Sequence, residues 1–257
     1  MDMQLAGRKV VITGGSKGIG LACAEAFAAE GAAIVISARD QERLAAAASG
    51  LSARFQVPVE AVPADLSRPE ERVRLHALHG DADILINNAG AIPAGTLAEI
   101  DLARWQAAWD LKVFGYIHLC QLFLPAMAAR RAGVIVNIIG MAGRAPRAHY
   151  IAGAAGNAAL IAFTQALGAA SVASGVRVLG INPGVTATDR MEAQARARAA
   201  RELGDAERWR ELLAGLPFGR PIAPREIAEL AVFAASPRAS YLSGTVLDVD
   251  GGAMHRA

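Results

Sequence analysis

The chain is poor in several features that mark particular classes of protein. It has 257 residues and only two cysteines, Cys23 and Cys120, which lie in apolar helical patterns and indicate buried thiols in a reducing compartment. Only three lysines occur, so nearly all of the positive charge is arginine. The formal net charge of +2 gives no basic field of the kind that nucleic acid requires. We therefore expect no nucleic-acid partner.

Membrane signals are also scarce. The first residues do not show the positively charged segment followed by an apolar segment that is typical of a signal peptide. No apolar run approaches the roughly 18 residues that a membrane span needs. Apolar residues make up 53% of the sequence and charged residues 19%, which favours a large buried core over disorder. The sequence predicts a cytoplasmic protein with no membrane partner and no metal site.

Short apolar, β-branched runs recur, and alanine-rich helical patterns separate them. Seven of these runs are expected to be strands: 9–13, 33–37, 59–64, 83–87, 133–139, 176–182 and 245–249. Runs without polar alternation suit strands that are covered on both faces, and strand–helix alternation indicates a parallel sheet. No repeat or linker divides the chain, so residues 1–257 are expected to form a single domain.

One stretch breaks this rhythm. Residues 191 to about 216 carry a charged helical pattern between the sixth strand and the next helix. Because α/β sheets bind ligands at the carboxyl ends of their strands, an insertion there (about 190–216) predicts a substrate lid. The alternative is a solvated amphipathic helix pair with no role in binding.

Glycine-rich turns follow several of the expected strands. TGGSKGIG (13–20) follows the first strand, and its glycines would bring backbone N–H groups against a pyrophosphate at a helix N-terminus. NNAG (87–90), NPG (182–184) and DGG (250–252) end the fourth, sixth and seventh strands. Together and in this order the motifs resemble the short-chain dehydrogenase/reductase family over essentially the whole chain. The resemblance implies a Rossmann-type doubly wound, seven-stranded parallel sheet with helices on both faces and a nicotinamide dinucleotide across the strand ends.

The resemblance also implies which residues bind this cofactor. They are Gly14, Ser16, Lys17, Ile19 and Gly20 at the phosphates, Asp65 and Leu66 at the adenine, Asn88, Ala89 and Gly90 along the adenosine ribose, and Pro183, Gly184, Val185, Thr186 and Thr188 at the nicotinamide end.

The residues after the second strand bear on the choice of dinucleotide. A carboxylate at position 38 would accept a ribose hydroxyl of NAD, but Ala38 and then Arg39 stand there, and arginine can pair with the 2′-phosphate of NADP. Lys17 adds a second positive charge. The sequence favours NADP(H). NAD(H) remains an alternative cofactor, because the site could still bind it if Asp40 faces the ribose or if Arg39 points into solvent.

The family's catalytic tetrad of asparagine, serine, tyrosine and lysine is missing from this sequence. Aligning the motifs places Lys112 at the asparagine position, Gly140 at the serine, Gly153 at the tyrosine and Asn157 at the lysine. The alignment needs no gap, because positions 140 and 153 keep the usual separation of thirteen.

Two residues are candidate replacements for the missing groups. Tyr150 stands one helical turn early and shares a helix face with positions 153 and 157, if the helix begins by then. The Tyr-x6-Asn spacing resembles the enoyl reductase branch, with asparagine in place of lysine. Asn157 could bond the nicotinamide ribose, but it cannot lower a phenol pKa as a cation does. Lys112 would favour a nearby anion, and the alternative is a lysine that snorkels or that pairs with Asp110 or another carboxylate.

These features leave two functions open. One is an NADP(H)-dependent oxidoreductase that transfers hydride to or from a small carbonyl, alcohol or activated enoyl substrate through an atypical site with Tyr150 and Lys112. The other is a catalytically silent NADP(H)-binding protein, either a redox sensor or the silent subunit of a hetero-oligomer. A lyase or dehalogenase is disfavoured, because such relatives tend to lose the glycine-rich loop. Arginines in the lid hint at an anionic substrate.

The resemblance also implies association between copies of the chain. A homotetramer or homodimer would use the long helices around 104–130 and 150–173, which are apolar on more than one face.

Overall fold

The computed structural model describes residues 2–256 and contains one seven-stranded parallel sheet. Its strands are β1 (Lys9–Thr13), β2 (Ala33–Ala38), β3 (Val59–Pro63), β4 (Ile84–Asn87), β5 (Gly133–Ile138), β6 (Val176–Pro183) and β7 (Val246–Val249). They lie in the order β3-β2-β1-β4-β5-β6-β7. The chain crosses over after β3, so a switch point lies between β1 and β4, where α/β sheets bind nucleotides. The predicted fold is confirmed, and each strand boundary was predicted to within one residue.

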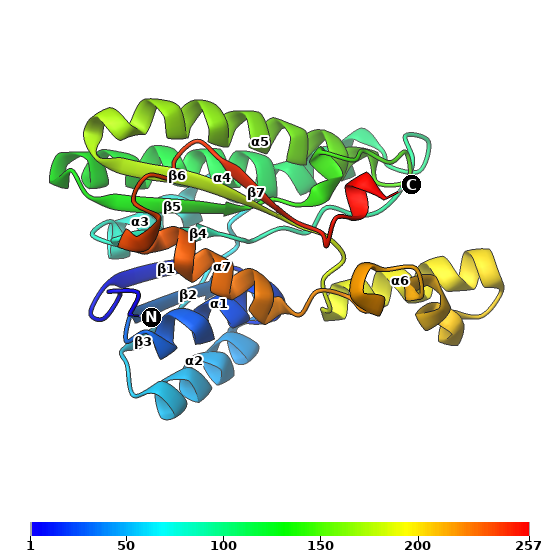
Figure 1. The fold of residues 1–257 in the computed structure, drawn as a ribbon, viewed down its shortest axis with the longest axis horizontal. Coiled ribbons are helices and arrows are strands. Elements are labelled where there is room, and N and C mark those ends of the chain that lie inside the picture. The colour runs from blue at the N-terminus through cyan, green and yellow to red at the C-terminus, as the bar shows by residue number, and fades with distance from the viewer. Residues whose placement is uncertain (1, 257) are drawn as a thin grey trace.

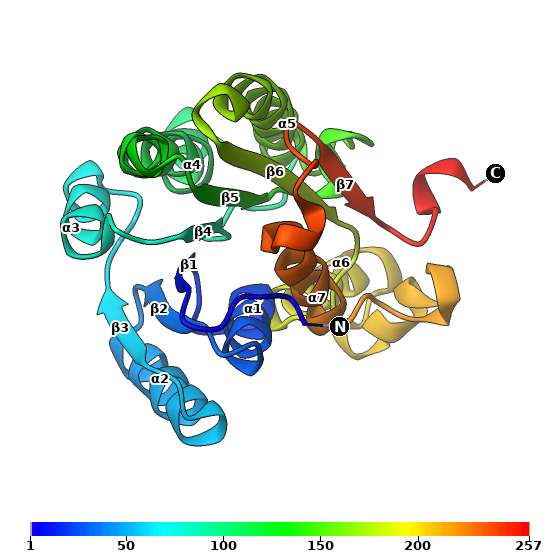
Figure 2. The same ribbon diagram turned by 60° about the vertical axis from the view of Figure 1, so that its left-hand side comes forward.

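Helices cover both faces of the sheet (Figures 1 and 2). One face carries α3 (Pro69–His79), α4 (Leu102–Arg130) and α5 (Ile151–Ser171), and the other carries α1 (Gly18–Ala29), α2 (Gln41–Phe55) and α7 (Pro224–Ala235). Short 3-10 helices span Met141–Gly143, Val172–Ser174, Ala206–Leu213, Pro217–Gly219, Pro237–Ala239 and Ala253–His255. This arrangement buries both faces of the central strands and leaves their carboxyl ends free.

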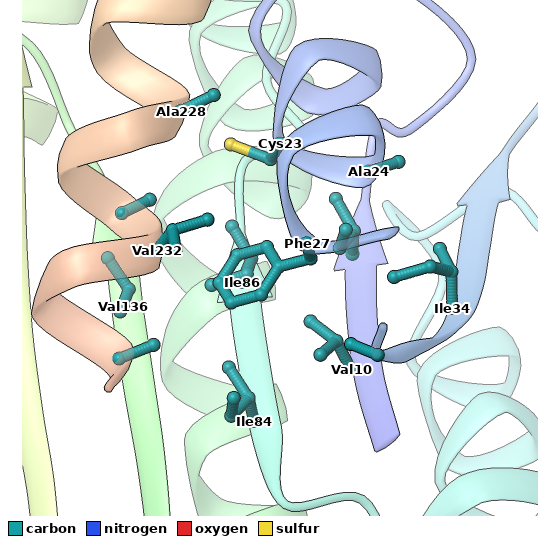
Figure 3. Close-up of a cluster of buried hydrophobic side chains, with 14 of the residues drawn as sticks. Val10, Cys23, Ala24, Phe27, Ile34, Ile84, Ile86, Val136, Ala228 and Val232 are labelled. Carbon is teal, nitrogen blue, oxygen red and sulfur yellow. The ribbon is translucent and has the colours of Figure 1, made fainter. Parts of the chain in front are cut away.

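The core between the sheet and α1 explains one cysteine. Cys23 lies among apolar side chains that include Phe27, Ile86 and Val232 (Figure 3). Burial raises the pKa of the Cys23 thiol, and likewise that of Cys120, to about 12, so neither thiol ionises at neutral pH. Both cysteines are free and buried, as the sequence predicts.

Two helices are long and apolar enough to cross a membrane by length and composition alone. They are α4 and the segment Ile151–Ser174, which contains α5. The prediction that no apolar stretch approaches the length of a membrane span is therefore wrong for these two helices. Scattered polar residues interrupt each apolar run, but the mean hydropathy of an 18-residue window stays high at 1.3. Both helices pack on the sheet and on each other. Only 39% of the apolar window of α4 and 50% of that of Ile151–Ser174 are buried.

The predicted lid region forms α6 (Asp189–Leu203) and the 3-10 helix Ala206–Leu213, which pack together beyond the carboxyl ends of the strands (Figure 1). Most arginines of this region pair with its own glutamates: Arg196 with Glu192 and Glu207, Arg198 and Arg201 with Glu202, and Arg208 with Glu211. These pairs neutralise the charge that hinted at an anionic substrate. These four arginines therefore do not by themselves indicate an anionic substrate.

Candidate functional site

A cleft of about 1160 Å³ lies at the carboxyl ends of the strands and gathers most of the predicted site residues. Those that line it are Gly14, Ser16, Lys17, Ile19, Arg39, Leu66, Asn88, Ala89, Gly90, Lys112, Gly140, Tyr150, Asn157, Pro183, Gly184, Val185, Thr186 and Thr188. The cleft also reaches Arg190, Met191 and Gln194 of α6. One continuous cavity therefore joins the glycine-rich turn to the predicted catalytic positions.

Hydrogen bonds fix the glycine-rich turn against the NNAG segment. The Thr13 hydroxyl accepts from the backbone N–H groups of Asn88 and Ala89 at 2.9 and 3.0 Å. The Asn88 amide donates to the Thr13 carbonyl oxygen at 3.0 Å. Gly20 packs beneath the turn, where an added Cβ would lie 2.1 Å from the Gly14 carbonyl oxygen. The glycine-rich turn after β1 and the NNAG segment after β4 are thus held together as one unit.

Three predicted positions do not line the cleft. Gly20 supports the turn from below, and Gly153 lies under the ring of Tyr150. The Asp65 carboxylate accepts from the backbone N–H and the hydroxyl of Ser67 at 3.1 and 2.8 Å. Asp65 therefore shapes its own turn, while its neighbour Leu66 faces the cleft.

The end of the cleft beside β2 is cationic. Lys17, Arg39 and Arg43 all line it. The Asp189 carboxylate lies 3.9 Å from Lys17 Nζ and 3.7 Å from Arg43 Nη1. Asp40, the group that left NAD(H) open, caps α2 by accepting from the Arg43 N–H at 3.0 Å. Its carboxylate therefore already serves the helix.

Gly140 and Asn157, at the predicted serine and lysine positions, contact each other. Gly140 has φ +135, a backbone conformation that L side chains rarely adopt. The Asn157 amide donates to the Gly140 carbonyl oxygen at 3.3 Å. Asn157 is only 3% exposed, and its Oδ1 has no hydrogen-bond partner among residues 2–256. A buried acceptor without a donor at the wall of a cleft is suited to a ligand hydroxyl.

Tyr150 occupies the space that Gly153 leaves open. A Cβ on Gly153 would lie 2.0 Å from Cε1 of the Tyr150 ring. Tyr150 is the N-cap of α5, one residue before the helix begins, with φ −138 and ψ 36. The helix therefore begins one residue after Tyr150, but the Tyr150 ring still lies against Gly153 on the predicted face. Tyr150 is half-buried against Ile92 and Trp109.

Lys112 projects from α4 into the same part of the cleft. Its ammonium donates to the Ile139 carbonyl oxygen at 2.6 Å and lies 5.9 Å from the centre of the Tyr116 ring. Burial, with a smaller contribution from the positive charge of Arg190, lowers the pKa of Lys112 to about 7. No ion pair joins Lys112 to Asp110 among the described residues, so this alternative does not describe the structure. A lysine that titrates near neutrality is suited to proton transfer.

Arg190, in the first turn of α6, closes the cleft over Tyr150. Its guanidinium donates to the carbonyl oxygens of Gly90, at 2.9 Å, and Ile92. It also donates to the Tyr150 hydroxyl at 3.4 Å. The lid helix thus contacts the loop after β4 and the start of α5 at one point.

Sequence reasoning missed Arg190 and Arg43. For Arg43 a signal existed, since a cation in the first turn of α2 opposes the helix dipole and is placed there at some cost. For Arg190 the nearest signal was its position two residues after Thr188, at the end of the nicotinamide motif.

The residues present fit a nicotinamide dinucleotide. The open N-terminus of α1 at Gly18 and the close packing at Gly20 form a phosphate cradle, and Asn157, whose Oδ1 is unsatisfied, lines the other end. The cleft exceeds the usual volume of a small-molecule site, about 300–1,000 Å³.

Comparisons with known proteins agree with this geometry. A family model described as short chain dehydrogenase matches residues 8–199. The chain is 32% identical to a 3-oxoacyl-acyl-carrier-protein reductase of Chlamydia muridarum, over 98% of this chain and 99% of the relative. It is 35% identical to a galactitol 2-dehydrogenase (L-tagatose-forming) of Cereibacter sphaeroides, over 97% and 96%. The crystal structure of L-sorbose reductase from Gluconobacter frateurii, complexed with NADPH and L-sorbose, has a TM-score of 0.92 and 35% identity over the full length of both chains. The chain belongs to the short-chain dehydrogenase/reductase family of oxidoreductases.

Proposed function

We propose that the protein is an NADP(H)-dependent oxidoreductase that interconverts a small carbonyl compound and its alcohol through an atypical proton donor. One observation carries this proposal: a single cleft joins a cationic pocket at its β2 end to a phenol that the Arg190 guanidinium contacts, and Lys112 lines the same cleft. A silent binding protein would need the first feature but not the second.

The cationic pocket supports NADP(H) over NAD(H). A 2′-phosphate dianion next to Lys17, Arg39 and Arg43 would gain charge-assisted hydrogen bonds. The carboxylate next to Arg39, that of Asp40, accepts the Arg43 N–H as the N-cap of α2, which leaves it less free to accept the ribose hydroxyl of NAD. We assign to these three side chains the recognition of the 2′-phosphate.

Tyr150 is the proposed proton donor, and Lys112 is the proposed proton reserve. When bound, the dinucleotide supplies the hydride. The carbonyl oxygen of the substrate would accept the phenol proton of Tyr150. Lys112, whose pKa is lowered to about 7 by burial, can hold a proton in the same part of the cleft at neutral pH. Asn157 would accept a ribose hydroxyl at its Oδ1 and so orient the nicotinamide end.

The substrate class follows from the relatives and the lid. Named relatives act on polyols, ketoses and 3-oxoacyl groups, as their names state. Arg196, Arg198, Arg201 and Arg208 are paired with glutamates, so a neutral polyhydroxy ketone or its polyol is the first class to test. The region of residues 190–216 would cover it as a lid.

We also propose that the protein is a cytoplasmic homo-oligomer, a tetramer or dimer. Phe114 and Leu102 on α4 are 51% and 72% exposed, and about half of the apolar window of Ile151–Ser174 is uncovered. Large apolar side chains on such helices favour association. Sedimentation of the purified protein, with Phe114→Glu as the disrupting variant, measures the number of copies.

The first experiment is a fluorescence titration of the purified protein with NADPH and NADH, followed by a screen of ketoses, polyols and 3-oxoacyl esters. Micromolar binding of NADPH and oxidation of NADPH by a carbonyl substrate are expected. Tyr150→Phe should abolish turnover while NADPH still binds. Binding without turnover of any acceptor would identify the silent protein instead.

The assignment of the 2′-phosphate has its own test. Arg39→Ala and Arg43→Ala should each weaken NADPH about tenfold or more, because each removes a hydrogen bond to a charged group. NADH affinity should stay unchanged. Arg54→Ala, which removes an arginine from the far end of α2, is the matched control. Equal losses for both cofactors would refute the assignment.

A further inference from the structure

We propose that Arg190 positions the Tyr150 phenol and supplies the positive charge that the missing lysine cannot. The inference rests on the proposed function, because it concerns the proposed proton donor. It gives the lid helix a part in the chemistry as well as in covering the site.

The geometry points to Arg190 through the bonds of its guanidinium. Two fixed backbone acceptors, the carbonyl oxygens of Gly90 and Ile92, hold the planar group in one orientation. The remaining contact is with the Tyr150 hydroxyl at 3.4 Å. Among residues 2–256, Arg190 is the only side chain that forms a hydrogen bond with this hydroxyl. A guanidinium cannot lose its proton in proteins, so its charge stays constant across the working pH range.

Other charged groups surround Tyr150 less directly. From α4, the Lys112 ammonium donates to the Ile139 carbonyl oxygen, and Tyr116 donates its hydroxyl proton to the Ile138 carbonyl oxygen at 2.9 Å. From the loop before α5, Arg147 and His149 are exposed to solvent. Tyr150 also packs against the apolar cluster of Ile92, Ile100, Ala108 and Ala152. Arg190 is therefore the cation that contacts the phenol.

The chemistry needs such a cation. In the reductive direction a C–H bond forms at the carbonyl carbon, the C=O π bond breaks, and the oxygen takes the phenol proton as the Tyr150 O–H bond breaks. The reduced cofactor is oxidised in the same step. This leaves a phenolate, which an adjacent positive charge stabilises until the proposed reserve, Lys112, or solvent returns a proton.

The test is a spectrophotometric titration of tyrosine in wild type, Arg190→Met, Arg190→Lys and Arg190→Gln. The chain has three tyrosines. Tyr116 is buried, which raises its pKa far above the usual range, and Tyr241 is fully exposed. The component that Tyr150→Phe removes can therefore be assigned. Arg198→Met, in the same helix but paired with Glu202, is the matched control.

We expect the pH midpoint of the Tyr150 component to be higher in Arg190→Met than in wild type. Arg190→Lys should stay nearer wild type, and Arg198→Met should match it. Should Arg190→Met fail to fold by circular dichroism, Arg190→Gln provides the same comparison. An unchanged midpoint in a folded neutral variant would overturn the inference.

Turnover separates this inference from the proposed function. If the midpoint rises but wild type reduces no carbonyl compound, the positioning role stands and the function fails. If Tyr150-dependent turnover persists with the same rate and pH profile in Arg190→Met, the function stands and the positioning role fails.

Discussion

At the scale of single residues, the substitutions at the predicted catalytic positions fit one another. Gly153 leaves room for the Tyr150 ring, which a Cβ there would meet at 2.0 Å. At Gly140, an added Cβ would lie 3.0 Å from Asn157 Nδ2. The glycines and their larger neighbours thus form two matched pairs. Restoring a tyrosine at position 153 alone would therefore displace the Tyr150 ring.

This pairing predicts a reversal of sign for Gly153→Ala. In wild type the added methyl group should displace the Tyr150 ring from the Arg190 contact and destabilise the protein by about 1–3 kcal/mol. In a Tyr150→Ala background the same change should stabilise it by up to about 1 kcal/mol, because alanine favours a helix over glycine. Urea unfolding of the four proteins measures both values. The same effect in both backgrounds would show that the ring does not depend on Gly153.

At the scale of elements, sequence patterns predicted the strands because each is a short apolar run between turn residues. The motifs predicted the cleft because each follows the carboxyl end of a strand, and parallel strands bring those ends together. The insertion that forms α6 and the 3-10 helix Ala206–Leu213 was located by its break in the pattern. Its contacts were not predicted, since Arg190 bonds to Gly90, one hundred residues away. The periodic spacing of apolar residues does not show which residues far apart in the chain form a hydrogen bond.

Tyr150 shows the same limit on a smaller scale. Spacing placed it on the helix face of residues 153 and 157, but the structure makes it the N-cap, just outside α5. Helix boundaries depend on local hydrogen bonds that apolar spacing does not encode. Here the Gly95 N–H donates to the His149 carbonyl oxygen at 2.7 Å and holds the segment before the helix.

The start of α6 gives a prediction at this scale. Asp189 lies near both Lys17 and Arg43, where the 2′-phosphate is proposed to bind. Asp189→Asn removes an anion that would repel the phosphate and compete for these cations. NADPH should bind about two- to fivefold more tightly, in line with an exposed ion pair, and NADH should be unaffected. The comparison is by fluorescence titration, with Glu192→Gln as the control in the same helix turn. Weaker NADPH binding would show that Asp189 organises the pocket instead.

At the scale of the whole molecule, the ends of the sheet differ in their ionisable groups. The carboxyl ends of the strands hold the cleft. Away from it, His79 is 3% exposed, with its Nε2 3.3 Å from Glu60. His118, on α4, accepts a hydrogen bond at Nδ1 from the buried Arg72 at 3.0 Å. A protonated imidazole could not accept that bond, so the fold requires neutral His118.

Both histidines should make stability depend on pH. Burial is the main cause that lowers the pKa of His79, and burial with the charge of Arg72 lowers the pKa of His118. A folded-state pKa below the unfolded value of about 6.5 means that the unfolded chain binds more protons between the two. This contribution is therefore fully present above that pH and is lost as the pH falls towards the folded-state values.

The depressed carboxylates act in a separate and lower window. The hydrogen bond and charge of Lys9 lower the pKa of Asp81, and the backbone and hydroxyl of Thr96 lower that of Glu99. Their contribution disappears only as the pH falls below their unfolded values, about 4. A loss of stability between pH 7 and pH 5.5 would therefore come from the histidines, with a part near pH 7 from Lys112, whose pKa burial lowers to about 7.

We expect the urea midpoint of wild type to fall between pH 7 and pH 5.5 and the fall to shrink in His79→Gln and His118→Gln. Glutamine stays neutral over this range, so neither variant can take up the proton that favours unfolding. His149→Gln, at an exposed loop position, should keep the full dependence. If all three variants lose stability as steeply as wild type, the pH dependence arises elsewhere. His79 and His118 would then be protonated in the folded protein. This would require Arg72 to give up its bond to His118 and to rely on the carbonyl oxygens of Leu66 and Asp110.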